Sequence, residues 1–112
     1  MKYGNKKTVI DGVKFDSKKE AQRYLTLKQM QDDGIITQLE CQPRFKLIDS
    51  QYFESIGKKE RGIEYVADFS YKDKAGRTIV EDVKSAITAK DKAYRIKRKL
   101  MKYFYDIEIL EV

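Results

Sequence analysis

The chain has 112 residues, one cysteine, no histidine and a formal net charge of +6. This length supports one hydrophobic core, so we expect a single domain over residues 1–112. The lone Cys41 excludes an internal disulfide, and the lack of histidine excludes histidine-based triads and a cysteine–histidine zinc site.

No stretch of the sequence looks able to cross a membrane. Every apolar run is shorter than the roughly 18 residues that a span requires. The first residues, Met1–Lys7, lack the apolar stretch of a signal peptide. We therefore expect no membrane partner and an intracellular protein.

The first predicted elements are a hairpin and a helix. Thr8–Phe15 alternates apolar and polar residues around Asp11-Gly12, a dipeptide that favours a tight hairpin turn. Ser17 predicts the start of a helix that runs to about Asp33. Its apolar stripe would be Ala21, Tyr24, Leu25, Leu27 and Met30.

Extended chain is predicted after the helix. Ile35–Ile48 looks extended but is broken at Gln42-Pro43, because proline favours a turn or a sheet edge. Ser50–Glu60 is polar and contains glycine, which fits a loop or a short hairpin. Arg61–Tyr71 alternates with period two and predicts a strand, and Arg77–Lys84 predicts another. One face of the first of these strands would carry Ile63, Tyr65, Ala67, Phe69 and Tyr71.

The turn between these last two strands sets their register. A three-residue loop that ends in Gly76, with glycine in the left-handed conformation, pairs Asp73 with Arg77. Asp68 then lies directly opposite Asp82, with Cβ atoms roughly 4.5–5.5 Å apart on one face. A register slipped by one residue would instead send the two aspartates to opposite faces, as ordinary solvated side chains.

Two directly opposed carboxylates need a compensating cation, because like charges destabilise a sheet. Mg²⁺ binds through one or two carboxylates together with waters and phosphate oxygens. Lys84 shares the face of Asp82, two residues along the strand, whereas Glu81 should face away. The three side chains fit a metal-dependent phosphodiesterase site, and from the hairpin alone this hypothesis and the solvated alternative stay equally open.

The positive charge is concentrated in one segment. Lys90–Lys102 holds seven basic residues and one acid, while the rest of the chain balances at 17 basic and 17 acidic residues. The segment predicts a helix to Phe104, because apolar residues recur at three- and four-residue spacing: Ala93, Ile96, Leu100, Tyr103 and Phe104. Its basic face suits a phosphate backbone, but it is also typical of solvated surface, a membrane-surface helix or a partner helix. The candidate nucleic-acid-binding residues are Lys90, Lys92, Arg95, Lys97, Arg98, Lys99 and Lys102.

The final segment, Asp106–Val112, predicts an apolar strand. With Arg77–Lys84 and the basic helix it forms a βαβ crossover, whose two strands should be parallel. The strands before it are antiparallel. The sequence therefore predicts an α/β fold with a mixed sheet flanked by helices.

The order of elements resembles the PD-(D/E)XK nuclease superfamily, which includes restriction endonucleases and Holliday-junction resolvases. Its members carry a carboxylate on one strand and (D/E)-x-K on the next, as Asp68 and Asp82-Val83-Lys84 do here. Over essentially the whole chain, five motifs are similar to small phage proteins that are grouped as a domain of unknown function within that superfamily. These motifs are Tyr3–Lys7, Phe15–Glu20, Leu39–Pro43, Tyr65–Phe69 and Glu81–Lys84.

The resemblance implies a restriction-endonuclease-like αβββαβ core with an N-terminal β-hairpin. It implies four catalytic residues, Glu20, Asp68, Asp82 and Lys84. The metal ligands would be Asp68, Asp82, Glu20 and the carbonyl of Val83, holding Mg²⁺, for which Mn²⁺ could substitute.

Two residues depart from the superfamily pattern, and two others have alternative roles. Ala67 stands where the name-giving proline would be, and Asp82 stands where glutamate is commoner. Ser17-Lys18-Lys19-Glu20 is also a capping box, in which the glutamate reaches back to the N-cap amide. Tyr94 would lie in the core or at its rim, or would join the nucleic-acid-binding residues by contacting a phosphate, as a tyrosine of the corresponding helix does in some relatives.

These implications describe a Mg²⁺-dependent DNA endonuclease that hydrolyses phosphodiester bonds. A domain of this size has little surface for reading bases, so we expect selectivity for branched DNA such as Holliday junctions, in phage DNA metabolism. Two symmetric cuts at a junction imply a homodimer, and a phage origin implies the cytoplasm of a bacterial host. Two alternatives stay open: a non-catalytic nucleic-acid-binding module, and a phage protein that binds a host factor.

Overall fold

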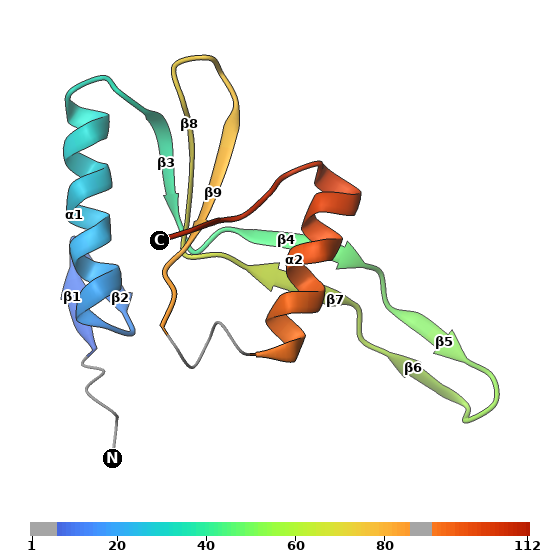
Figure 1. Cartoon of the computed structure of the whole chain (residues 1–112). Coiled ribbons are helices and arrows are strands. Elements are labelled where there is room, and N and C mark those ends of the chain that lie inside the picture. Colours follow the sequence, from blue (N-terminus) through green and yellow to red (C-terminus); the bar gives the residue numbers. More distant parts are fainter. Residues whose placement is uncertain (1–6, 86–90) are drawn as a thin grey trace.

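The computed structural model describes residues 7–85 and 91–112, which form an α/β fold (Figure 1). The helices in this part are α1 (Lys18–Asp32) and α2 (Lys92–Tyr105). The strands are β1 (Thr8–Ile10), β2 (Val13–Phe15), β3 (Thr37–Cys41), β4 (Arg44–Ile48), β5 (Gln51–Phe53), β6 (Lys58–Glu60), β7 (Ile63–Val66), β8 (Phe69–Lys72), β9 (Thr78–Asp82) and β10 (Leu110–Glu111). Neither described helix is long and apolar enough to span a membrane.

The N-terminal hairpin and helix form as predicted. β1 and β2 pair antiparallel, and Asp11 and Gly12 take the positive φ angles of 52° and 78° that their tight turn requires. Ser17 caps α1 by accepting a hydrogen bond from the Glu20 N–H at 3.1 Å. The predicted apolar stripe of α1 is wrong at one position, because Leu25 is 50% exposed.

A mixed sheet in the order β10-β9-β8-β3 forms the centre of the fold. β9 is antiparallel to β8, and β10 lies parallel to β9, so the predicted crossover through α2 joins parallel strands. The mixed α/β class is thereby confirmed. β10 is shorter than the predicted strand because Asp106, with a φ of 55°, caps α2 instead of continuing as extended chain.

Two long segments break where they cross each other. The break between β3 and β4 falls at Gln42-Pro43, as the proline predicted, because proline has no N–H for a ladder. Across it, the Ala67 N–H donates to the Pro43 carbonyl (3.0 Å) and the Gln42 N–H donates to the Asp68 carbonyl (2.9 Å). The single strand predicted for Arg61–Tyr71 is therefore wrong, since the chain divides there into β7 and β8.

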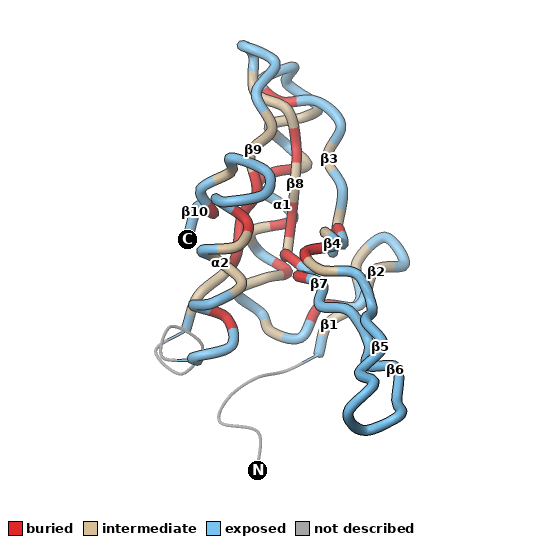
Figure 2. Tube along the Cα trace, turned by 90° about the vertical axis from the view of Figure 1, so that its right-hand side faces the viewer, coloured by how far each residue is buried: buried red, intermediate tan, exposed pale blue. Residues whose placement is uncertain are grey.

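The breaks send part of the chain away from the central sheet. β4 pairs with β7, and the β5–β6 hairpin extends the same ribbon outward (Figure 1). All residues from 51 to 60 are exposed (Figure 2). At the joint, a Cβ on Gly62 would lie 2.2 Å from the Ile48 carbonyl oxygen, so the close approach of the two chains requires glycine.

Two hydrophobic clusters lie on opposite faces of β9. Val80 belongs to the cluster under α2, whereas Ile79 in the same strand and Val83, which directly follows it, pack against the cluster under α1, as strand alternation requires. The α1 cluster contains Phe15, Ala21, Tyr24, Leu27, Ile36, Phe69 and Tyr71. The α2 cluster contains Leu47, Tyr65, Ala67, Val80, Tyr94, Met101 and Ile109. The face predicted for Arg61–Tyr71 is thus shared between the two clusters, and Ile63 is 40% exposed.

The predicted buried face of the basic helix is wrong. α2 buries Tyr94 and Met101, whereas Ile96, Tyr103 and Phe104 are exposed. The cause is the Tyr94 ring, which packs beside Tyr65 in the α2 cluster and fixes the rotation of the helix. Of the predicted apolar row, Leu100 packs against the α2 cluster, whereas Ile96, Tyr103 and Phe104 face outward.

Glu81 is fully buried between the sheet and α1. Arg23 donates two hydrogen bonds to its carboxylate, from Nε at 2.7 Å and from Nη2 at 2.6 Å, and the Tyr71 hydroxyl donates a third. Glu81 faces the α1 side of β9, away from Lys84, as the alternation predicted. The ion pair between Arg23 and Glu81 therefore joins α1 to the central sheet.

We predict that Arg23→Ala destabilises the protein by about 3 kcal/mol, because it leaves the buried Glu81 carboxylate without its cation. Urea unfolding followed by circular dichroism measures the loss. Lys28→Ala is the matched control, since it breaks an exposed ion pair with Asp11 on the same helix and should change stability little. Equal losses in the two variants would contradict this role for Glu81.

Candidate active site

The β8–β9 pairing has the predicted register. Phe69 lies opposite Glu81, and Lys72 lies opposite Thr78. Asp68 lies one residue beyond this pairing. Its N–H donates to the Glu81 carbonyl at 3.1 Å, and its carboxylate contacts the Asp82 carboxylate. The slipped register, which would have separated the two aspartates, does not occur.

The turn that sets this register is held by Asp73. Its carboxylate accepts hydrogen bonds from the N–H groups of Ala75 and Arg77, both at 2.9 Å. Gly76 takes a φ of +82°, the left-handed conformation that glycine adopts without strain. The aspartate pair thus depends on a turn at the far end of the two strands.

Asp68 and Asp82 line an open cleft of about 540 Å³, which we call the carboxylate cleft. It lies among β7, the end of β9 and the first turns of α1 and α2. The lining residues that bear on its chemistry are Glu20, Tyr65, Asp68, Asp82, Val83, Lys84, Tyr94 and Lys97. All four residues expected to be catalytic therefore face one space, although they come from distant parts of the sequence.

The two aspartates share a partly buried environment. Burial, followed by a hydrogen bond with the Asp82 carboxylate, raises the pKa of Asp68 to about 8, while the Val83 N–H donates to Asp68 Oδ2 at 2.6 Å and opposes the shift. Near neutral pH, and without a cation, the pair accordingly holds a proton. A divalent cation could take the place of that proton.

Lys84 is fixed by groups on both sides of its ammonium. Its Nζ lies 2.5 Å from Asp82 Oδ2 and 3.3 Å from the centroid of the Tyr94 ring. Its backbone is held as well, because its N–H donates to the Val112 carbonyl (2.9 Å) and its carbonyl accepts from Lys19 Nζ (2.7 Å). These contacts place one positive charge beside the aspartate pair.

Tyr94, expected in the core, at its rim or against a phosphate, is buried in the wall of the cleft. Its hydroxyl donates to Glu111, which also accepts from Arg98 Nη1 at 3.0 Å. Burial and then this hydrogen bond raise the pKa of Tyr94. The hydroxyl is therefore occupied by Glu111, and the ring face supports Lys84.

Glu20 lies at the start of α1 and borders the cleft. Its N–H donates to the Ser17 hydroxyl at 3.1 Å, and the residue lines the carboxylate cleft. The side-chain bond of a capping box is not among the hydrogen bonds of residues 7–85 and 91–112, and the catalytic role stays a prediction. Burial, followed by the negative charge of Asp16, raises the pKa of Glu20, and the charge of Asp82 adds to the effect. Among the described residues, however, no group of three carboxylate, cysteine or histidine side chains is arranged to hold a metal ion. A cation here would depend mainly on Asp68 and Asp82.

Tyr65 contributes a feature that the sequence did not reveal. Its hydroxyl is buried and has no hydrogen-bond partner in the described part of the chain. Burial raises the pKa of Tyr65, followed by the charge of the nearby Asp82 carboxylate and a contact with it that is too poorly aligned for a full hydrogen bond. Alternation predicted only that Tyr65 faces the core, because only the folded chain places its hydroxyl beside the two aspartates. An unsatisfied hydroxyl there can bond a water or a phosphate oxygen in the cleft.

The predicted basic surface is only partly free. Lys90 lies outside the described residues, Lys102 pairs with Asp106 and Glu108, and Arg98 pairs with Glu111. The other basic residues of α2 form no ion pair within the described ranges: Lys92, Arg95, Lys97 and Lys99. Of these, Lys97 lines the carboxylate cleft.

We predict that the metal-free protein loses stability as the pH rises from about 4 to about 8. The folded pKa of Asp68, about 8, exceeds its ordinary value of 3.8, so the folded state binds more protons between these values. The contribution of Asp68 to the slope should not exceed about 1.4 kcal/mol per pH unit. Unfolding in EDTA at a series of pH values measures it, and excess Mg²⁺ should restore stability at high pH.

Asp68→Asn should flatten this pH dependence, because the amide does not titrate. Asp32→Asn, an exposed substitution on α1, is the matched control and should keep the wild-type profile. A profile for Asp68→Asn that follows the wild type would contradict the shared proton.

The comparisons with known proteins identify a family without an assigned activity. No curated protein and no solved structure is significantly similar to the chain. Residues 1–110 match the family model described as "Protein of unknown function (DUF1064)". Since the match spans nearly every residue, the chain belongs to the DUF1064 family.

Proposed function

We propose that this protein is a Mg²⁺-dependent DNA endonuclease of the PD-(D/E)XK type. The observation that carries the proposal is the opposed pair of Asp68 and Asp82, partly buried in one cleft with the Lys84 ammonium 2.5 Å from Asp82. A pair of carboxylates with one adjoining lysine suits phosphodiester hydrolysis, which needs a cation site and a further positive charge near the phosphate.

The residues present fit Mg²⁺ as the cation. Asp68 and Asp82 would hold it, with the Val83 carbonyl and Glu20 as further oxygen ligands, and waters and phosphate oxygens would complete its shell. When bound, the ion would supply an activated water and neutralise charge that develops on the phosphate, and Mn²⁺ could replace it. The raised pKa of Asp68 supports this fit, because burial beside the Asp82 carboxylate makes the ionised pair unfavourable unless a cation is present.

The chain's own groups would position the reactants. The Val83 N–H donates to the Asp68 carboxylate and fixes its position. The Tyr94 ring contacts the Lys84 ammonium and holds it beside the two aspartates. From there Lys84 would orient the attacking water or stabilise the pentacovalent phosphate. The unpartnered Tyr65 hydroxyl would bond the same water or a phosphate oxygen.

The proposed substrate class rests on the small size of the chain and on its resemblance to the PD-(D/E)XK superfamily. A chain of 112 residues leaves little surface for base-specific contacts, so we favour branched DNA such as a four-way junction over a fixed recognition sequence. Paired cuts at a junction would require a homodimer. The cytoplasm of a bacterium infected by a phage is the compartment that this assignment implies.

A non-catalytic nucleic-acid-binding module is the second candidate. The observation in its favour is that Lys84 is already paired with Asp82 and stacked on Tyr94, as a structural ion pair would be. Such a module would bind DNA with strong salt dependence and without regard to Mg²⁺. A phage protein that binds a host factor would instead show no affinity for DNA.

Cleavage of labelled four-way junction, flap, single-stranded and linear duplex DNA separates these functions. We predict cutting by the wild type in Mg²⁺ or Mn²⁺, none in EDTA, and a fall of at least about 100-fold in Asp82→Asn and in Lys84→Met. Both variants should keep DNA binding.

Asp32→Asn and Lys74→Met are matched controls, because each makes the same chemical change on an exposed surface away from the cleft. Circular dichroism checks that all four variants fold. Retained cutting in both cleft variants would reject the site, and binding without cutting by the wild type would favour the non-catalytic module.

A further inference from the structure

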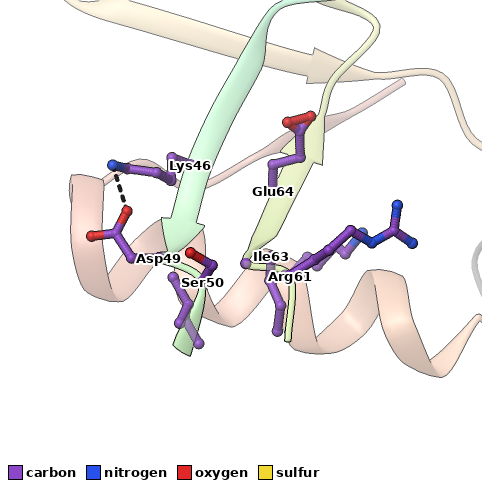
Figure 3. A pocket seen from close by; sticks show the side chains of 9 residues that line it. Lys46, Asp49, Ser50, Arg61, Ile63 and Glu64 are labelled. Carbon is purple, nitrogen blue, oxygen red and sulfur yellow. Dashed lines mark ion pairs between the residues drawn. The ribbon is translucent and has the colours of Figure 1, made fainter. Parts of the chain in front are cut away.

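A second hollow adjoins the carboxylate cleft along the ribbon. This hollow, which we call the ribbon groove, has a volume of about 680 Å³ and is lined by β4, β7 and the chain that joins them to β5 and β6 (Figure 3). Lys97 of α2 also lines it. Glu64 and Lys97 line both hollows, so the ribbon groove and the carboxylate cleft are neighbours on the surface.

The charges of the ribbon groove are unevenly balanced. Lys46 pairs with Asp49 at 2.7 Å, and Glu64 pairs with Arg44 at 2.5 Å. Arg61 and Lys97 form no ion pair within residues 7–85 and 91–112. In Figure 3 the Arg61 side chain extends away from both Asp49 and Glu64. Arg61 and Lys97, which have no ion-pair partner in the described part of the chain, therefore place two positive charges at the ribbon groove, next to the carboxylate cleft.

The part of the ribbon groove near Arg61 is apolar and carries few large side chains. Ile48 and Ile63 line the groove, and Ile63 is 40% exposed. Gly62 leaves the wall without a side chain at the point where a Cβ would meet the Ile48 carbonyl. Such a surface can contact sugars and bases while the cations contact phosphates.

The position of Lys97 distinguishes it from the other basic residues of α2. It follows Tyr94 by three residues, so it lies on the side of the helix that faces the sheet. Arg95 and Lys99 are rotated by about 100° and 140° from Tyr94 around the helix. They are exposed on a side that lines neither hollow.

We propose that the ribbon groove binds the DNA strand beside the bond that is cut, with Arg61 and Lys97 contacting its phosphates. The inference rests on the proposed function, because the strand is the one whose phosphate enters the carboxylate cleft. It adds a defined path along the ribbon, where the sequence predicted only a basic helix face. Arg61 stands outside that face and was not among the candidate residues.

The test is DNA binding in EDTA, which requires no cleavage. Fluorescence anisotropy with labelled single-stranded and duplex DNA compares the wild type with a double variant, Arg61→Gln with Lys97→Gln. We expect at least about a 10-fold loss of affinity at 0.1 M salt. The slope of log affinity against log salt concentration should also decrease by the amount expected for about two lost phosphate contacts. In Mg²⁺, cleavage of the same DNA should weaken through KM more than through kcat.

Two comparison variants remove the same amount of charge. The first combines Lys14→Gln in β2 with Lys74→Gln in the β8–β9 turn and controls for the change in net charge. The second combines Lys92→Gln with Lys99→Gln and removes charge from the outer side of α2. A loss that is largest in the groove variant supports the path. A loss that is equal in all three, or largest in the outer pair, overturns it.

The outcome separates this inference from the proposed function. If the wild type cuts no DNA but the groove variant alone binds weakly, the nuclease assignment fails and the groove stands. If the wild type cuts DNA and the groove variant binds and cuts as well as the controls, the nuclease assignment stands and the groove fails.

Discussion

The proximity of the Asp68 and Asp82 carboxylates in a partly buried cleft is the constraint on which the candidate site depends. The β8–β9 register brings the two carboxylates together, and burial makes their joint ionisation costly, as the pKa of about 8 for Asp68 indicates. The Val83 N–H and the Lys84 ammonium offset part of that cost. A proton or a divalent cation supplies the rest, so the same interaction that strains the folded protein would equip it to bind a metal.

The break at Pro43 links this pair to the rest of the molecule. Because proline cannot donate to the ladder, the strands separate there, and Asp68 lies at the point of separation. Beyond it, β4 and β7 leave the central sheet as the ribbon, which places the ribbon groove next to the carboxylate cleft. One interruption of the sheet thus creates both the open end at which Asp68 is accessible and the surface proposed to hold the strand.

The local parts of this architecture could be predicted from sequence, whereas the parts set by packing could not. The register followed from Gly76 and the turn at Asp73, and Ser17 correctly marked the start of α1, because both signals act over a few residues. The division of β7 from β8 has no signal at Ala67-Asp68, since its cause is a proline on the opposing strand. The rotation of α2 was missed because Ile96 and Tyr103 fit helical periodicity as well as Tyr94 and Met101 do, and only the contact of Tyr94 with Tyr65 selects between them. The unpartnered Tyr65 hydroxyl escaped notice for the same reason.

Binding of Mn²⁺ measured by electron paramagnetic resonance tests the central claim, that the two aspartates form a cation site, without requiring a DNA substrate. The account predicts that the wild type binds Mn²⁺, that Mg²⁺ displaces it, and that a double variant with Asp68→Asn and Asp82→Asn loses this binding while remaining folded. Asp32→Asn should bind Mn²⁺ as the wild type does. Equal binding by the wild type and the double variant, or no binding by the wild type, would contradict the account.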